Sequence, residues 1–205
     1  SMGKLDRKKL LYYKGNKIFL DHGIQKDFSP GLEYENTRLD LFTVGGYKPY
    51  QYILKTYNYP DKVVQYTGTA RYDSLKNKCE NYILLFPTWR ENLYKLNDSD
   101  FIKTNYYIKY MSLINNKDLD NILEDNNLKM IFYPHYEIQK RINLFKTNCK
   151  NIIIANSKEY DVPDLLKGNR LMITDFSSVY FDQAFLKKPV IYYHFDYDEY
   201  RKYHY

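Results

Sequence analysis

Polar side chains that could hold a phosphate follow an apolar run near the end of the chain. Leu171-Met172-Ile173 has the length and composition of a buried strand. Thr174, Asp175, Ser177 and Ser178 come next, and their oxygens can accept hydrogen bonds from the free N–H groups of a first helical turn. Such a turn offers hydroxyl groups and a helix N-terminus to a phosphate. The alternative is that these side chains only cap the helix.

The residues after this turn are predicted to complete a strand–turn–helix–strand unit. Tyr180, Phe181, Ala184 and Phe185 recur at helical spacing and are expected to form one buried face. Val190–Tyr193 is expected to be the next strand. Turns of this kind lie where open α/β sheets present their ligands.

A histidine occupies a similar position early in the chain. The strand expected at Lys17–Leu20 runs directly into Asp21-His22-Gly23. Gly23 lets the backbone turn sharply and leaves the imidazole of His22 uncovered. The residues alone leave open whether His22 is a base or a structural histidine.

Two further cationic or titratable side chains follow predicted strands. Arg90 comes after the strand expected at Tyr82–Phe86, and its planar guanidinium could meet a phosphate. The alternative for Arg90 is a surface ion pair with Trp89 packed beneath it. His135 comes after the strand expected at Lys129–Tyr133.

The composition bounds the possible partners. The 205 residues carry a net charge of +6, which suits an anionic substrate, an anionic membrane surface or nucleic acid without choosing between them. The 25 tyrosines could stack on bases, but biased codon usage explains them better, and we expect no nucleic-acid partner. Cys79 and Cys149 lack metal or disulfide spacing and are expected to be free thiols. No acidic cluster suits Mg²⁺, so neither metal nor cofactor is expected.

The apolar runs also help to predict where in the cell the protein is located. None approaches the roughly 20 residues that cross a bilayer, and no secretory leader opens the chain. We therefore expect a cytoplasmic protein that can lie peripherally on the inner face of the membrane. Ser1-Met2 resembles a cleavage scar, which predicts that the native N-terminus is missing and that this chain is incomplete.

Several stretches resemble the CDP-glycerol glycerophosphotransferase family, whose members build teichoic acids and related polymers of glycerol or ribitol phosphate. The longest is Ile173–Asp182, followed by Lys187–Tyr193 and Phe195-Asp196. The resemblance covers nearly the whole chain from Lys17 onward. Three shorter stretches also resemble the family: Phe19–Asp27, Thr67–Asp73 and Pro87–Arg90.

The resemblance implies roles for individual residues. His22 would be the general base that takes the proton of the acceptor, since a histidine with an ordinary pKa of about 6.5 can serve near neutral pH. Ser177 and Ser178 would hold the diphosphate of the donor. His135 and Arg90 would add positive charge there.

Asp182 lies within the first turns of the same helix. A carboxylate close to phosphate would repel it, so we expect Asp182 to contact polyol or ribose hydroxyls, or to serve only the helix. Family members have His-Pro where this chain has Pro134-His135, which leaves the orientation of the histidine open. The expected catalytic residues are His22 and His135, and the expected substrate-binding residues are Arg90, Thr174, Asp175, Ser177, Ser178 and Asp182.

The alternation of strands and helices predicts an α/β fold with parallel sheets covered by helices. The resemblance implies two Rossmann-like domains of the GT-B type, with a reduced N-terminal domain. We expect a partial acceptor-side domain at residues 1–77 and a CDP-donor-binding domain at residues 78–205. Within the second, we expect a mobile polar loop at residues 92–104 and a helix from residue 137 to about 145.

The function implied is transfer of glycerol phosphate or ribitol phosphate from a CDP-activated donor to a hydroxyl of a growing cell-surface polymer, with release of CMP. The acceptor would be a polyol-phosphate or glycan chain, of teichoic-acid or capsule type, and it could be lipid-linked. Two alternatives come from other classes: a nucleotide-sugar glycosyltransferase of the same fold, and a non-catalytic fragment that binds nucleotide or polymer.

Overall fold

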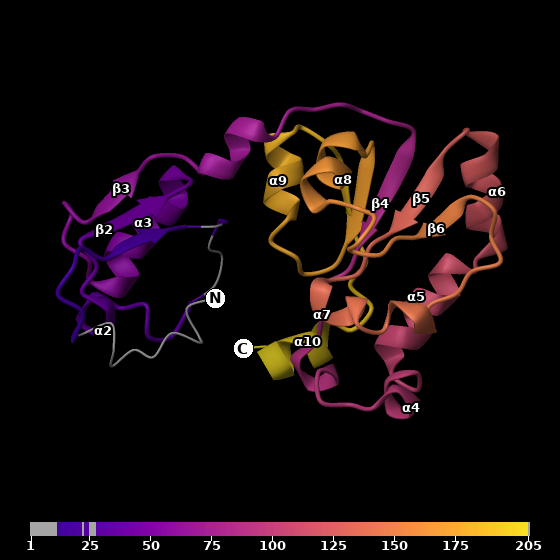
Figure 1. The fold of residues 1–205 in the computed structure, drawn as a ribbon, viewed down its shortest axis with the longest axis horizontal. Helices are drawn as coiled ribbons and strands as arrows, with labels where there is room; N and C mark the ends of the chain where they lie inside the picture. The colour runs from indigo at the N-terminus through magenta and orange to yellow at the C-terminus, as the bar shows by residue number, and fades with distance from the viewer. Residues whose placement is uncertain (1–11, 22, 25–27, 205) are drawn as a thin grey trace. The chain divides into compact units, whose positions relative to one another are not determined.

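The apolar runs form two separate parallel sheets, one in each of two compact units, residues 1–74 and residues 75–205 (Figure 1). The computed structural model of the protein describes residues 12–21, 23–24 and 28–204. His22 lies outside these ranges.

Over its described residues, the first unit forms a sheet with the strand order β1-β2-β3. Helix α3 lies against this sheet, and its residues Ile53 and Tyr57, one turn apart, are buried with Phe42 and Val64. Gly46 precedes α3, as the Gly45-Gly46 pair predicts. The elements are β1 (Ile18–Leu20), α2 (Tyr34–Thr37), β2 (Leu41–Val44), α3 (Tyr47–Tyr57), β3 (Val64–Tyr66) and the 3-10 helix η2 (Ala70–Ser74).

In the described part of the second unit, parallel strands pair in the order β6-β5-β4-β7-β8. Burial on both faces explains why the inner strands β4, β5 and β7 are almost wholly apolar in sequence, whereas Ile191 and Tyr192 of the edge strand β8 are exposed. The strands are β4 (Tyr82–Phe86), β5 (Lys129–Phe132), β6 (Ile152–Ile154), β7 (Leu171–Thr174) and β8 (Val190–Tyr192).

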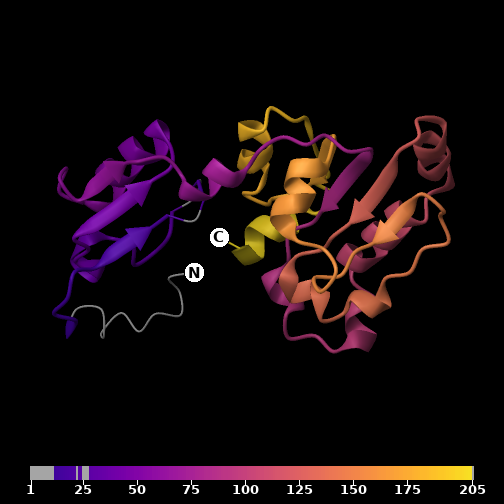
Figure 2. The same ribbon diagram turned by 45° about the horizontal axis from the view of Figure 1, so that its top comes forward.

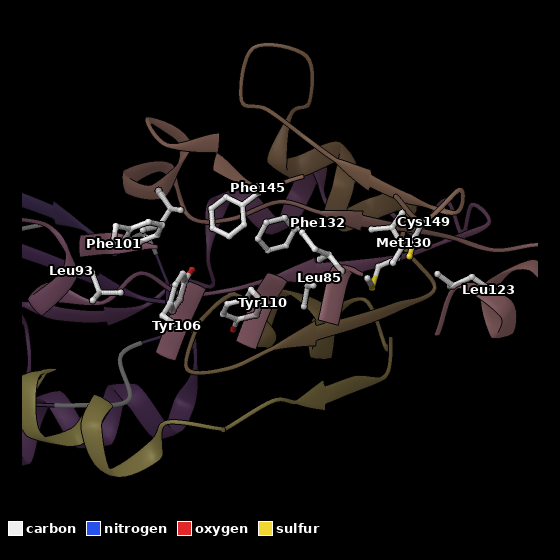
Figure 3. Packing of buried hydrophobic residues seen from close by; sticks show 13 residues of the cluster. Leu85, Leu93, Phe101, Tyr106, Tyr110, Leu123, Met130, Phe132, Phe145 and Cys149 are labelled. Atoms are coloured by element: carbon white, nitrogen blue, oxygen red, sulfur yellow. The ribbon is translucent and has the colours of Figure 1, made fainter. Parts of the chain in front are cut away.

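Helices cover both faces of this sheet. On one face, α5 and α6 pack over residues such as Leu85 and Phe132, and Figure 3 shows the rings of Tyr110, Phe132 and Phe145 lying next to one another. On the other face, α8 packs against β4 (Figure 2). There the Tyr82 hydroxyl donates to the carbonyl of Leu165 at 3.0 Å. The helices are α4 (Asp98–Phe101), α5 (Asn105–Ile114), α6 (Lys117–Asp125), α7 (Tyr136–Gln139), α8 (Val162–Gly168), α9 (Tyr180–Phe185) and α10 (Tyr197–His204), with 3-10 helices η3 (Glu91–Leu93) and η4 (Ile142–Leu144).

Two predicted segments differ from the structure. The expected mobile loop at residues 92–104 is wrong, because α4 forms there and Phe101 is fully buried in the core. The expected helix from residue 137 to about 145 is interrupted after α7. The backbone N–H of Arg141 bonds to the carbonyl of Ile138, three residues back, and the 3-10 helix η4 follows, while the side chain of Arg141 bonds to Leu93, Leu96 and Asp98.

Helix α9 also buries a different face from the one predicted. Ala184 and Phe185 are exposed, whereas Asp182, Gln183 and Leu186 point inward. The amide of Gln183 donates to the carbonyl of Leu166 at 3.3 Å, so the polar residues of this face are held by α8. The spacing of the apolar residues alone therefore predicted the wrong buried face for α9.

Candidate functional site

The strand order places a switch point at the carboxyl ends of β4 and β7. The chain passes from β4 outward to β5 and β6, then returns to the opposite side of β4 to form β7 and β8. Phe86 and Thr174, the last residues of β4 and β7, are partners in register. Ligands of open α/β sheets bind outside the carboxyl ends of strands at such points. The segments after these strands therefore define the candidate site.

Arg90, which follows β4, is buried in this region with 3% of its surface exposed. Its Nε donates to Asp196 at 2.7 Å, and its Nη2 donates to Asp175 at 2.8 Å and to Asp196 at 3.0 Å. Its Nη1 donates to the carbonyls of Thr88 and Trp89. All five guanidinium N–H groups are thus used. Arg90 therefore has no donor left for a phosphate. The phosphate contact that the sequence predicted is not available, and Arg90 instead holds Asp175 and Asp196 in place.

Asp175 is equally committed to the protein. One carboxylate oxygen accepts from the backbone N–H groups of Thr88, at 2.8 Å, and Phe176, at 2.7 Å. The other accepts from Arg90 and from the Tyr110 hydroxyl at 2.9 Å. A carboxylate has about four lone-pair sites, and these partners fill them. Asp175 therefore joins the segments after β4 and β7 and does not reach a substrate.

The charges of this buried cluster determine its protonation. Desolvation alone would lower the pKa of Arg90, but the hydrogen bonds to Asp196 and the charge of Asp175 more than offset it, and the pKa is raised. Burial, reinforced by the charge of Asp175, raises the pKa values of Tyr106 and Tyr110, so both phenols stay neutral. Arg90, Asp175 and Asp196, with Tyr110, are called the ionic cluster below.

Thr174 differs from its expected role, and Asp182 fits the second of its two expected roles. The Thr174 hydroxyl is buried and donates to the carbonyl of Phe86 at 2.6 Å, which ties β7 to β4. Asp182 is 1% exposed on the inward face of α9, so a ligand in solvent does not reach it. The structural role that the sequence left open for Asp182 is the one that its position fits.

Ser177 and Ser178, by contrast, face outward in the segment between β7 and α9. Helix α9 begins at Tyr180 and not directly after Thr174. The Ser177 hydroxyl accepts from the N–H of Val179 at 3.3 Å, and Ser178 is exposed. Among the described residues, nothing accepts a hydrogen bond from the backbone N–H of either serine. Two adjacent N–H donors and two hydroxyls are therefore available to an anion at the switch point.

His135 caps the short helix α7 after β5. Its Nδ1 accepts from the N–H of Glu137 at 3.3 Å, and its ring stacks on Trp89 with the centroids 6.0 Å apart. Desolvation lowers its pKa from the ordinary 6.5, although Glu137 and Asp175 oppose this effect. The ring is therefore neutral near pH 7 with its proton on Nε2. His135 can donate one hydrogen bond from Nε2, but it does not supply the positive charge that was expected.

A cleft of about 380 Å³ opens beside His135 at the ends of β4 and β5. The ring of Tyr94 meets the edge of Trp89 at 6.4 Å, and the Lys140 ammonium lies 5.5 Å from the centre of the Tyr94 ring. The cleft thus combines aromatic surface with charged side chains. Its lining residues are Trp89, Arg90, Tyr94, Asp98, Glu137, Ile138, Lys140 and Arg141.

The first unit brings together two stretches that resemblance had singled out. The N–H of Asp21 donates to the Thr43 hydroxyl at 3.4 Å, which fixes the backbone just after β1. A Cβ built on Gly23 would lie 3.5 Å from Nη2 of Arg71. Arg71, in the matched stretch Thr67–Asp73, therefore lies beside the residue that follows His22.

Sequence reasoning passed over His194, which the structure places two residues beyond β8 and in contact with the segment after β7. The matched stretches end at Tyr193 and resume at Phe195, so no motif pointed to it. Over residues 12–21, 23–24 and 28–204, no group of three His, Cys, Asp or Glu side chains could hold a metal ion. Nor does any described helix combine the length and apolarity needed to cross a membrane.

Comparison with known families and sequences identifies one family. The sequence model of a family described as CDP-Glycerol:Poly(glycerophosphate) glycerophosphotransferase matches residues 20–204. The chain is 36% identical over 205 residues to the minor teichoic acid biosynthesis protein GgaB of Bacillus subtilis, covering 90% of this chain and 23% of that protein. It is 35% identical over 125 residues to a teichoic acid poly(glycerol phosphate) polymerase of Bacillus spizizenii, covering 61% of this chain and 29% of the relative.

Solved structures show the same fold. The wall teichoic acid polymerase TagF superposes with a TM-score of 0.62 at 19% identity, over 91% of this chain and 51% of that one. Another TagF structure, obtained with CDPG, gives 0.60 at 20% identity over 93% and 50%. The chain thus spans about a quarter of the length of these curated relatives and about half of the solved chains.

Proposed function

Because the chain belongs to the CDP-glycerol:poly(glycerophosphate) glycerophosphotransferase family, we propose that it transfers a polyol phosphate from a CDP-activated donor to a hydroxyl of a growing teichoic-acid polymer. The acceptor oxygen bonds to the phosphorus that carries the polyol. The P–O bond of the anhydride breaks, and CMP leaves with the electron pair. The proton of the acceptor hydroxyl passes to a base.

The observation that carries this proposal is the pair of serines at the switch point. The free N–H groups and hydroxyls of Ser177 and Ser178 suit the oxygens of a diphosphate, which gain charge as CMP departs. The ionic cluster beneath them supports the proposal because it fixes the segment that carries them. Donors held in place before the reaction need no reorganisation during it.

His135 has a modified role in this proposal. Because its Nδ1 is occupied as a helix cap, its Nε2–H is the group that faces a ligand as a hydrogen-bond donor. A neutral imidazole can bond to a phosphate oxygen without adding charge. We assign the base to His22, whose neighbour Gly23 lies next to Arg71, a cation suited to the phosphates of an acceptor polymer.

The same proposal includes the kind of donor, the kind of acceptor and a contact with the membrane. Relatives include both poly(glycerol phosphate) polymerases and ribitol-phosphate polymerases of Staphylococcus aureus, so the donor is CDP-glycerol or CDP-ribitol. The net charge of +6 supports an anionic acceptor, which can be lipid-linked, and a peripheral contact with an anionic membrane on its cytoplasmic side.

The test measures CMP release by the full chain with CDP-glycerol, CDP-ribitol and UDP- or GDP-sugars over several polyol-phosphate acceptors. Acceptor-dependent CMP release from a CDP-polyol supports the proposal. Turnover of a sugar nucleotide alone would make the chain a glycosyltransferase, and donor binding without any turnover would make it a binding module.

The same assay addresses the base. His22→Ala should lower the rate by about 10²–10⁴-fold, the usual cost of losing a general base, while donor affinity stays near wild type. Lys62→Ala, an exposed change in the same unit, is the control and should leave the rate unchanged. A His22 variant of full activity would remove His22 from the reaction.

A further inference from the structure

His194 forms the outer layer of a stack of rings beside the two serines. Its imidazole lies parallel to the ring of Phe176, with centroids 4.6 Å apart and planes at 5°. Tyr200 covers the opposite face of Phe176 at 3.8 Å and 6°. The Arg90 guanidinium lies 5.1 Å from the centre of Phe176 and 4.9 Å from that of Tyr200. His194 is therefore held against the ionic cluster, although it is itself exposed.

One hydrogen bond fixes the tautomer of this histidine. Its Nε2 lies 2.8 Å from the backbone carbonyl oxygen of Asp175. A carbonyl oxygen can only accept, so Nε2 must carry the proton. In the neutral ring Nδ1 is then a bare acceptor, and no described residue donates to it. A backbone carbonyl that orients one ring nitrogen and leaves the other free is the arrangement in which histidine serves a ligand.

The ring of His194 contacts the segment that carries the two serines of the proposed donor site. Asp175, whose carbonyl holds the ring, is two residues before Ser177, and Phe176 lies against it. A bare lone pair beside a diphosphate would repel its oxygens, whereas it would accept a hydrogen bond from a hydroxyl. A CDP-polyol carries hydroxyls on its ribose and on its polyol.

We propose that His194 is a further donor-binding residue, which accepts a hydrogen bond at Nδ1 from a ribose or polyol hydroxyl of the CDP-polyol. This inference rests on the proposed function, because it takes the donor from there. His194, which lies between two matched stretches, thereby helps to select the part of the donor that carries hydroxyls.

Two substitutions of His194 distinguish the role of Nδ1 from that of Nε2. His194→Gln places an amide where Nε2 stands and can still donate to the Asp175 carbonyl, but it lacks an acceptor at Nδ1. His194→Asn places an amide near Nδ1 and loses the bond to Asp175. His194→Phe keeps the ring on Phe176 without either nitrogen, and its thermal unfolding shows whether the stack alone preserves the fold.

The measurement is calorimetric affinity of the full chain for CDP-glycerol and for CDP. We expect His194→Gln and His194→Phe to weaken binding of CDP-glycerol by about two- to tenfold, the usual net worth of one hydrogen bond, and His194→Asn to weaken it less. A loss seen with CDP-glycerol but not with CDP identifies a polyol hydroxyl, and an equal loss with both identifies a ribose hydroxyl.

Two outcomes would overturn the inference. Wild-type affinity in His194→Gln, with a loss in His194→Asn, would show that only the bond to Asp175 matters. Unchanged affinity in every variant would remove His194 from the site. Failure of the wild-type chain to bind CDP-glycerol at all would instead count against the proposed function, so the two failures are distinguishable.

Discussion

The segment after β7 has two halves that use their polar groups in opposite ways. In residues 174–176, the Thr174 hydroxyl and the Asp175 carboxylate are buried and fully bonded to the protein. In residues 177–178, Ser177 is half-buried and Ser178 is exposed, and both backbone N–H groups are unpaired among the described residues. The buried half fixes the position of the backbone, and the other half keeps polar groups that the protein does not use. Polar side chains a few residues apart are thus bonded to the protein or left available because their burial differs.

Removing the arginine tests the buried half most severely. Arg90→Ala leaves the carboxylates of Asp175 and Asp196 buried without their cation, and we expect a loss of about 3–5 kcal/mol in the free energy of unfolding. Urea denaturation measures it. Arg170→Ala, an exposed arginine of the same unit, should change stability by about 0.5 kcal/mol or less. Equal stability of the two variants would show that the cluster does not hold the segment.

Two tyrosines of α5 sharpen the comparison within the core. Tyr106 and Tyr110 are both buried, one turn apart (Figure 3). The Tyr110 hydroxyl donates to Asp175, whereas the Tyr106 hydroxyl has no partner in the described structure. Tyr110→Phe should cost about 1.5–3 kcal/mol, the range for a hydrogen bond to a charged group. Tyr106→Phe, its matched control, should be neutral or slightly stabilising. The opposite order in chemical denaturation would contradict the bonding described for Asp175.

Changing the two serines should affect binding and not folding. Ser177→Ala combined with Ser178→Ala is expected to weaken donor affinity by about five- to a hundredfold, since two hydrogen bonds of about 0.5–1.5 kcal/mol each are lost. Thermal unfolding should stay at the wild-type temperature. Ser112→Ala on the exposed side of α5 is the control. A double variant that binds CDP-glycerol like wild type would remove the serines from the donor site.

The smallest effect concerns pH and His135. Its folded-state pKa lies below the ordinary value of about 6.5, so the unfolded chain takes up the proton first. The stability that neutral His135 contributes is therefore complete above about pH 6.5 and is lost as the pH falls through the lowered pKa.

His135→Asn can keep the cap on α7 without titrating. Thermal unfolding at pH 7.5 and pH 5.5 should show a larger drop for the wild-type protein than for this variant, since every other group titrates alike in both. A drop of the same size in both proteins would mean that burial does not lower the pKa of His135.

Much of the architecture was readable from local signals. Continuous apolar runs predicted the strands, because parallel strands are buried on both faces, and the boundaries agree within one or two residues. The serines at the end of β7 were found because a polar pair after an apolar run marks a strand end. Resemblance over most of the chain supplied the family, which the match to residues 20–204 confirms.

Only the tertiary structure decided what the other polar residues do. Arg90 meets Asp175 and Asp196 across 85 and 106 positions of sequence, and no local pattern shows that its donors are used there. Asp182 and Gln183 lie on the inner face of α9 because α8 bonds to that face, against the apolar spacing. The ring of His194 is oriented by the carbonyl of Asp175, in the segment after β7. The sequence determines which groups stand at strand ends, but whether each is consumed by the protein or left for a ligand depends on partners that only folding brings together.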